Sequence, residues 1–178
     1  MLFNSIAFAV FLPAVFALYW WVFRERRAQN AFLLLASWAF YAWWDCRFLG
    51  LLWFSTAADY IIGARLHAEK EARRRKAWLI LSIGINIGLL CAFKYMGFFV
   101  ESAAELLRAM GMDPHLPVLR LALPVGISFY TFQTLSYTID IHRGHFKPTG
   151  DPIAFGAFVA FFPQLVAGPI ERARDLLP

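Results

Sequence analysis

The chain has 178 residues, of which 60% are hydrophobic and only 16% charged, and its formal net charge is +5. Soluble domains use roughly 25% charged residues to cover their surface, so the composition excludes an ordinary soluble globular protein. The positive charge does not indicate a nucleic-acid partner, because the basic residues lie in short runs between apolar segments. Such runs are topology signals, or contacts to the head groups of membrane lipid.

Long uncharged apolar stretches predict an all-α, multi-span integral membrane protein with a single membrane domain, residues 1–178. The predicted spans, in chain order, are residues 3–23, 30–44, 48–64, 77–99, 119–140 and 152–170. Only Asp45–Arg47 separates the second span from the third, which predicts a helical hairpin. After the fourth span, residues 100–117 are expected to form a short surface helix.

The second predicted span is short for a membrane helix. Its fifteen residues, 30–44, would reach about 22 Å, whereas the hydrocarbon core of a bilayer is about 30 Å thick. Either the bilayer is thinner at this helix, or the helix packs against other protein, or the predicted boundary is misplaced by a few residues.

The distribution of lysine and arginine predicts the orientation. Loops 24–27, 65–76 and 141–151 carry three, six and two of these residues, whereas segments 45–47 and 100–117 carry one each. Basic residues are enriched in cytoplasmic loops, so we expect the first three loops in the cytoplasm and the N-terminus outside.

The fifth predicted span is unusually polar. Its surroundings read LPVGISFYTFQTLSYTIDIHRG, and at about 100° per residue Tyr130, Gln133, Tyr137 and Asp140 fall in one stripe. Polar groups inside a bilayer must be satisfied, which predicts an interior helix packed on several sides. The stripe either joins helices through hydrogen bonds or lines a substrate path, for which these four residues are the candidates.

Other polar residues are candidates for a site. Asp140 and Arg143 can pair at a spacing of three. Lys94, near the outer end of the fourth span, can extend to lipid head groups or bind an anion. Asp59 lies within the third span and needs a buried partner, which the sequence does not identify.

The last apolar segment is interrupted at Pro163 and again at Gly168-Pro169, and Glu171 and Arg172 follow directly. A broken helix exposes backbone groups that must face protein or a cavity, although an ordinary end of a span would have the same sequence. Glu171 and Arg172 are therefore further polar candidates.

Catalytic and metal-binding motifs are not evident. The chain has no G-x-S-x-G, glycine-rich phosphate loop or H-E-x-x-H sequence. His142 and His145 are three residues apart, but no further ligand cluster accompanies them, so no metal site is predicted.

Taken together, the motifs resemble a known family. LPVGISFYTFQTLSYTIDIHRG, followed by FVAFFPQLVAGPIERARDLLP, is similar to the N-terminal part of the membrane-bound O-acyltransferases. The earlier FLPAVFALYWW, SWAFYAWWD and FKYMGFF fit the same bacterial branch, that of the alginate O-acetyltransferases and the related D-alanyl transferases of teichoic acid. The resemblance spans essentially the whole chain.

The resemblance implies a ring of membrane helices around a funnel, in the plasma (inner) membrane of a bacterium. It also implies transfer of an acyl group, acetyl in this branch, from cytoplasmic acetyl-CoA to a hydroxyl of an exported polysaccharide such as alginate. Accessory acyl-transfer proteins outside the cytoplasm are the implied partners, together with membrane lipid. No cofactor is expected to stay bound.

The resemblance also implies a catalytic histidine well C-terminal to the GPIER sequence. None of the four histidines, His67, His115, His142 and His145, matches that motif, and His142 stands where relatives commonly have tyrosine. No catalytic residue is therefore assigned to this chain. We interpret it as an N-terminal fragment that is inactive alone, a truncated product or one part of a split protein. The alternatives are a non-catalytic membrane scaffold and a transporter component.

Overall fold

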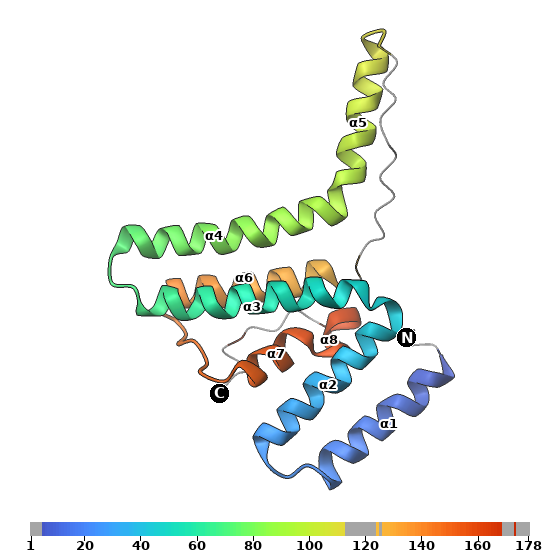
Figure 1. Cartoon of the computed structure of the whole chain (residues 1–178), viewed down its shortest axis with the longest axis vertical. Helices are drawn as coiled ribbons and strands as arrows, with labels where there is room; N and C mark the ends of the chain where they lie inside the picture. Colours follow the sequence, from blue (N-terminus) through green and yellow to red (C-terminus); the bar gives the residue numbers. More distant parts are fainter. Residues whose placement is uncertain (1–4, 113–123, 125, 169–172, 174–178) are drawn as a thin grey trace.

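The computed structural model describes residues 5–112, 124, 126–168 and 173, and every element in this part of the chain is a helix (Figure 1). The elements, in chain order, are α1 (Ile6–Trp21), α2 (Arg26–Asp45), α3 (Arg47–Ala68), α4 (Ala72–Leu90), the π-helical turn η1 (Cys91–Tyr95), α5 (Met96–Ala109), α6 (Ile127–His142), α7 (Pro152–Ala160) and α8 (Phe162–Ala167). The predicted all-α class is confirmed.

One helix among the described residues is long and apolar enough to cross a membrane by length and composition. It is the continuous run Ala72–Ala109, which comprises α4, η1 and α5. Ile6–Trp21 and Pro152–Leu165 are shorter apolar helices. These helices support a membrane protein, and the arrangement with several spans stays a prediction.

Helices α3, α4 and α6 lie side by side and contact one another along their lengths (Figure 1). Helices α2 and α7 pack together beside this layer, and α1 lies outside α2. The ring of Phe162, at the start of α8, contacts both α1 and α2. Its centroid lies 5.4 Å from that of Phe11 on α1 and 5.2 Å from that of Phe40 on α2. After η1 the chain turns sharply, and α5 extends away from the rest of the molecule (Figure 1).

Close packing of α3 on α6 depends on Gly63. A Cβ at this position would lie 2.6 Å from Cε1 of Tyr137 and 3.2 Å from Cδ1 of Ile141. The Tyr137 ring fills the space that the missing side chain leaves, and its centroid lies 4.6 Å from that of Phe155 on α7. The core of the molecule therefore lies between α3, α6 and α7.

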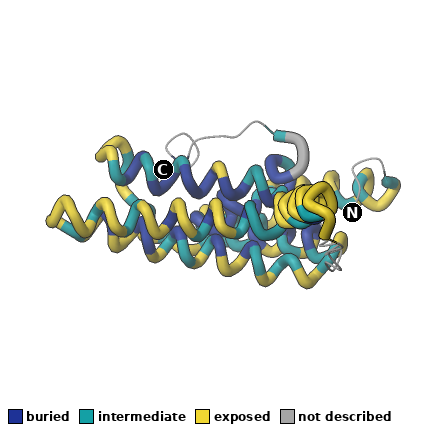
Figure 2. Tube along the Cα trace, turned by 90° about the horizontal axis from the view of Figure 1, so that it is seen from above, coloured by how far each residue is buried: buried dark blue, intermediate teal, exposed yellow. Residues whose placement is uncertain are grey.

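Much of the outer surface is apolar. On α1, Ile6 is 85% exposed and Trp21 79% exposed, and on α5 Phe98 and Leu106 are more than 60% exposed. Figure 2 shows α5 end-on, with exposed residues almost all round. Contiguous exposed apolar surface of this kind is rare on soluble monomers and is typical of surfaces that face lipid or further protein.

Several helix boundaries differ from the predicted ones. Helix α2 has 20 residues and would reach about 30 Å, because it begins four residues before the predicted span and ends one residue after it. How much of α2 lies in a membrane stays a prediction. Where a surface helix over 100–117 is predicted, α5 begins earlier, at Met96, directly after η1, and ends at Ala109, and residues 113–117 lie outside the described residues. The break predicted near Pro163 is confirmed: Phe161 has an extended ψ of 106° between α7 and α8.

The predicted hairpin between α2 and α3 is confirmed. Only Cys46 separates the two helices, and the Arg47 guanidinium donates to the Asp45 carboxylate across 2.8 Å. These hydrogen bonds lower the pKa of Asp45 below its usual range. The turn lies outside the predicted spans, where such a charged pair remains accessible to water.

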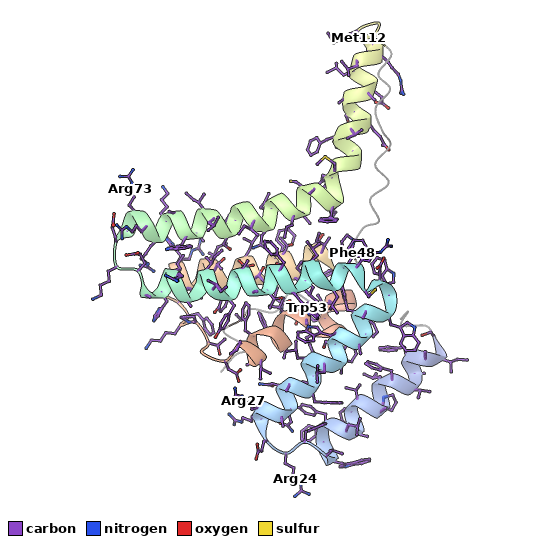
Figure 3. All side chains as sticks on the ribbon, in the orientation of Figure 1. Arg24, Arg27, Phe48, Trp53, Arg73 and Met112 are labelled. Atoms are coloured by element: carbon purple, nitrogen blue, oxygen red, sulfur yellow. The ribbon has the colours of Figure 1, made fainter. Side chains whose placement is uncertain are left out.

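Two of the three basic loops meet at one end of the helices. Arg75, at the start of α4, donates to the carbonyl of His142 at the end of α6, across 3.0 Å. In Figure 3, Arg73 lies at this end of α4, whereas Arg24 and Arg27 lie at the lower ends of α1 and α2. The positive-inside rule requires the loops before α4 and after α6 to share a side, as they do here.

Candidate functional site

A polar network lies at the centre of the α3–α4–α6 layer. The Asp59 carboxylate on α3 accepts a hydrogen bond from Ser82 Oγ at its Oδ1 and one from Asn86 Nδ2 at its Oδ2, both of 2.7 Å. Asp59, Ser82 and Asn86 are all completely buried. The buried partner that Asp59 requires is therefore supplied by α4.

Helix α6 completes this network. Thr134 Oγ1 donates to Asn86 Oδ1 across 3.1 Å, and Thr138 Oγ1 lies 3.1 Å from Ser82 Oγ. Ser55 on α3 lies at the limit of hydrogen bonding from Asn86 Oδ1, at 3.5 Å. The network therefore joins α3, α4 and α6 through residues that lie 23 to 56 positions apart.

Each of the three helices contributes two polar residues spaced four apart. They are Ser55 and Asp59 on α3, Ser82 and Asn86 on α4, and Thr134 and Thr138 on α6. Residues at i and i+4 lie on the same helix face, one turn apart, so each pair presents two polar groups to the same neighbours. The sequence contains this signal, but sequence reasoning singled out only Asp59 and did not group the six residues.

The polar network around Asp59 is suited to holding helices together. In the described part of the chain, Asp59 has no basic side chain within ion-pair distance, so hydrogen bonds from neutral groups compensate its carboxylate. Because all of its side chains are completely buried, no substrate can reach them in this conformation. Such polar contacts between helices are a recognised means of association in membranes.

The predicted stripe on α6 faces a different part of the core. Tyr130 and Tyr137 are completely buried, and Gln133 and Asp140 are nearly so. In the described structure the Tyr130 hydroxyl has no hydrogen-bond partner. Asp140 Oδ1 lies 4.0 Å from Nδ1 of His145, whereas Arg143, its predicted partner, is exposed. Whether any of the four lines a substrate path stays a prediction.

Gln133 has a specific contact at the break between α7 and α8. Its Nε2 donates to the carbonyl of Phe158 across 2.9 Å, and that carbonyl lies in the last turn of α7, where helical partners run out. On the other side of the break, Ser37 Oγ on α2 accepts from the backbone N–H of Phe162 across 3.3 Å. Two buried side chains therefore satisfy the backbone groups that the broken helix frees.

The other candidates lie apart from this core. Lys94 on η1 is exposed, and its Nζ lies 3.2 Å from Ser128 Oγ on α6. Glu171 and Arg172 lie outside the described residues. Among the residues that the structure describes, no group of three His, Cys, Asp or Glu side chains is placed to hold a metal ion.

A groove of about 310 Å³ opens between α2, α3 and α7. Its lining comprises Leu34, Trp38, Trp53, Thr56, Ala57, Tyr60, Ile61, Pro152, Ile153, Phe155 and Gly156. The Tyr60 hydroxyl is turned away to the carbonyl of Gly150, at 3.1 Å, so the lining is almost wholly apolar. The groove offers no group for acid–base or nucleophilic chemistry.

Comparison with known proteins gives consistent matches. The chain is 42% identical over 179 residues to the probable alginate O-acetylase AlgI of Pseudomonas aeruginosa, covering 99% of this chain and 34% of that protein. It is 41% identical to the probable alginate O-acetylase AlgI of Azotobacter vinelandii, with 99% and 35% covered. It is 30% identical over 208 residues to the peptidoglycan O-acetyltransferase of Helicobacter pylori, covering 100% of this chain and 38% of that protein.

The chain thus spans about a third of the length of the curated relatives it matches. The expected resemblance to alginate O-acetyltransferases is confirmed. No family model and no solved structure matches the chain.

Proposed function

We propose that this chain is the N-terminal part of a membrane-bound O-acyltransferase that transfers acetyl groups to hydroxyls of an exported polysaccharide such as alginate. The observation that carries the proposal is the similarity to alginate O-acetylases over 99% of the chain, at about 40% identity. The match to a peptidoglycan O-acetyltransferase over the whole chain supports the same chemistry on a second polysaccharide.

In this proposal the chain forms part of the wall of a funnel of membrane helices. The buried network between Asp59, Asn86 and Thr134 holds three helices of the wall together. The apolar outer surface of α1 and α5 faces lipid or further protein. In this proposal the catalytic base is the histidine that the family resemblance places C-terminal to the GPIER sequence, outside residues 1–178.

The remaining parts of the proposal concern the surroundings of the enzyme. The acyl donor is acetyl-CoA on the cytoplasmic side, the protein lies in a bacterial inner membrane with its N-terminus outside, and accessory proteins act on the outer side. The contact of Arg75 with the carbonyl of His142, which puts the basic loops before α4 and after α6 together, supports a common side for these two loops.

The activity is tested by expressing the full-length product of the gene in an alginate-producing bacterium that lacks its own alginate O-acetylase. We expect acetyl groups to reappear on the polymer, as measured by NMR of the purified polysaccharide. The control is a protein limited to residues 1–178, which should insert in the membrane and restore no acetylation. A full-length protein that reaches the membrane and leaves the polymer unacetylated would refute the proposal and favour a scaffold.

The orientation has its own test. Cys46 is exposed in the α2–α3 turn, so in a Cys91→Ser background a membrane-impermeant maleimide should label it in intact spheroplasts. In a variant without either native cysteine, Lys147→Cys in the loop before α7 should be labelled only after permeabilisation. The reverse pattern would place the N-terminus in the cytoplasm.

A further inference from the structure

We propose that α5 lies in the outer surface of the membrane, with one side of the helix among the lipid and the other in water. This placement goes beyond the proposed function and uses only two of its parts: α4 crosses the membrane, and the loop before α4 is cytoplasmic. Figure 1 shows α5 turned sharply away from α4 at η1, and Figure 2 shows it end-on while the α3–α4–α6 layer runs across the view. A helix that lies across the direction of the spanning helices, at one end of them, runs along the membrane plane.

The two sides of α5 differ in polarity. At about 100° per residue, the charged residues of the helix fall within an arc of about 60°. They are Glu101, Glu105 and Arg108. The opposite side carries large apolar residues that are 57%, 63% and 66% exposed, namely Phe99, Leu106 and Met110. Phe98 departs from this pattern, because it lies beside the charged arc in the first turn, where its ring packs against that of Phe99 with 5.7 Å between the centroids.

The bend at η1 directs the apolar side of α5 toward the membrane around α4. In Figure 1, α3 and α6 lie on one side of α4 and α5 extends to the other, so the face of α4 that packs on α6 continues onto the outside of the bend. Counting one extra residue for the π-helical turn, the charged residues of α5 fall within about 60° of Asn86, which contacts α6. The apolar residues therefore lie on the inside of the bend, in phase with the exposed Ile80 and Ile87 of α4.

This arrangement fits a lipid surface. The 19 residues of α4 and the five of η1 would reach about 36 Å, which is enough to cross a hydrocarbon core of about 30 Å before α5 begins. Continuation of α5 through the bilayer would put three charged side chains in hydrocarbon, which is unfavourable. An amphipathic helix in the membrane plane instead buries its apolar side about 5–10 Å deep and leaves its charges in water. Tyr95, which is 40% exposed at the bend, is of a residue type enriched at membrane interfaces.

The test measures the depth of single residues in the full-length product of the gene, placed in nanodiscs of phosphatidylcholine. Cys46 and Cys91 are replaced by serine, and one cysteine at a time, over residues 99–110, is introduced and labelled with the fluorophore NBD. Lipids with a nitroxide at a shallow or a deep carbon of the acyl chain quench the label according to its depth, and iodide quenches a label that is in water. We expect the label of Leu106→Cys about 5–10 Å below the head groups, and that of Glu105→Cys to be quenched by iodide and not by lipid.

Two controls accompany this scan. Ile83→Cys, near the middle of the run Ala72–Tyr95, should be quenched best by the deep nitroxide, as the crossing of the membrane by α4 requires. The polar side of α5 carries two carboxylates and one guanidinium, so it has no excess of positive charge that would attract anionic lipid. The depth of the Leu106→Cys label should therefore be the same when phosphatidylglycerol replaces half of the phosphatidylcholine.

Each of four other results would overturn the proposal. Quenching by iodide at every position would place α5 in water. A depth that increases steadily along the scan would make α5 part of a membrane span. Protection of Phe99→Cys, Leu106→Cys and Met110→Cys from both kinds of quencher would show that protein, and not lipid, covers this side. A label at Ile83→Cys no deeper than that at Leu106→Cys would show that α4 does not cross the membrane.

Failure of this inference is distinguishable from failure of the proposed function, because the depth of the labels is measured without any acyl donor or acceptor. A protein that acetylates alginate and shows one of the four contrary patterns keeps the function and loses the placement of α5. A protein that shows the expected pattern and leaves alginate unacetylated keeps the placement and loses the function.

Discussion

The side-chain amide of Asn86 donates a hydrogen bond of 2.7 Å to the carboxylate of Asp59, and both residues are completely buried between α3 and α4. The same amide group of Asn86 accepts from Thr134 on α6. One asparagine side chain therefore links three helices, and the stability of the layer depends on all of its hydrogen bonds being made. A buried network with unmade hydrogen bonds destabilises the folded protein, because each unpaired group gives up its hydrogen bonds to water and gains no partner in the protein.

We expect Asp59→Ala to destabilise the protein by about 1–3 kcal/mol, because it removes the buried acceptor of the Ser82 hydroxyl and of one N–H of Asn86. Asp59→Asn should be close to the unmodified protein, since its oxygen can accept from Asn86 while its amide donates to Ser82. The measurement is thermal unfolding in detergent. Asp45→Ala, which removes the carboxylate of the α2–α3 turn, is the control and should have a small effect. Equal melting temperatures for Asp59→Ala and Asp45→Ala would contradict a structural role for the network.

Gln133→Leu removes the donor that satisfies the Phe158 carbonyl at the α7–α8 break. An unpaired buried carbonyl costs about 1–3 kcal/mol, so we expect less folded protein in the membrane. Ser136→Ala on the same helix is the control, because Ser136 Oγ only donates to the carbonyl of Gln133 within α6. Acyl transfer by the full-length protein decides between the two interpretations of the stripe. A fall in activity that matches the fall in folded protein indicates helix packing, whereas a clearly larger fall indicates lining of the substrate path.

Gly63→Ala should destabilise the protein by about 1–3 kcal/mol, because the new methyl group would overlap the buried ring of Tyr137. Gly50→Ala on the same helix is a matched control, since a Cβ there meets no atom within 4 Å. It should be neutral or stabilising by up to about 1 kcal/mol, because alanine favours the helix. Chemical denaturation of the two variants side by side measures the difference. A Gly63→Ala protein as stable as Gly50→Ala would show that α3 and α6 do not pack as closely as the structure has them.

Arg75→Gln should loosen the contact between the start of α4 and the end of α6. The Arg75 guanidinium donates to the carbonyl of His142, one of the acceptors that a helix C-terminus leaves unpaired, so its loss should cost about 1–2 kcal/mol. Arg74→Gln removes only an exposed pair with Glu71 and should cost less than about 0.5 kcal/mol. Limited proteolysis of the loop between α6 and α7 provides the readout. Faster cleavage in Arg74→Gln than in Arg75→Gln would refute the assignment.

Helix α6 shows which structural features can be predicted from the sequence alone. Its composition and stripe predicted an interior helix, and the structure buries ten of its sixteen residues. Gln133 and Asp140 belong to the predicted polar stripe, but a neighbouring face of the helix, about 100° away and containing Thr134 and Thr138, carries the hydrogen bonds to α4. Periodicity identifies which residues share a face, and it does not identify the helix that this face meets.

By itself, the sequence determined the features that depend on local chemistry. Apolar runs without charges specify helices, a three-residue charged turn at Asp45–Arg47 specifies a hairpin, and Pro163, which has no N–H to donate, ends a helix. Only the tertiary structure decided which polar groups meet: Asp59 with Asn86, Gln133 with Phe158, and Arg75 with His142. Those partners lie 25 to 67 positions apart, and their pairing depends on the packing of whole helices, which no local pattern encodes.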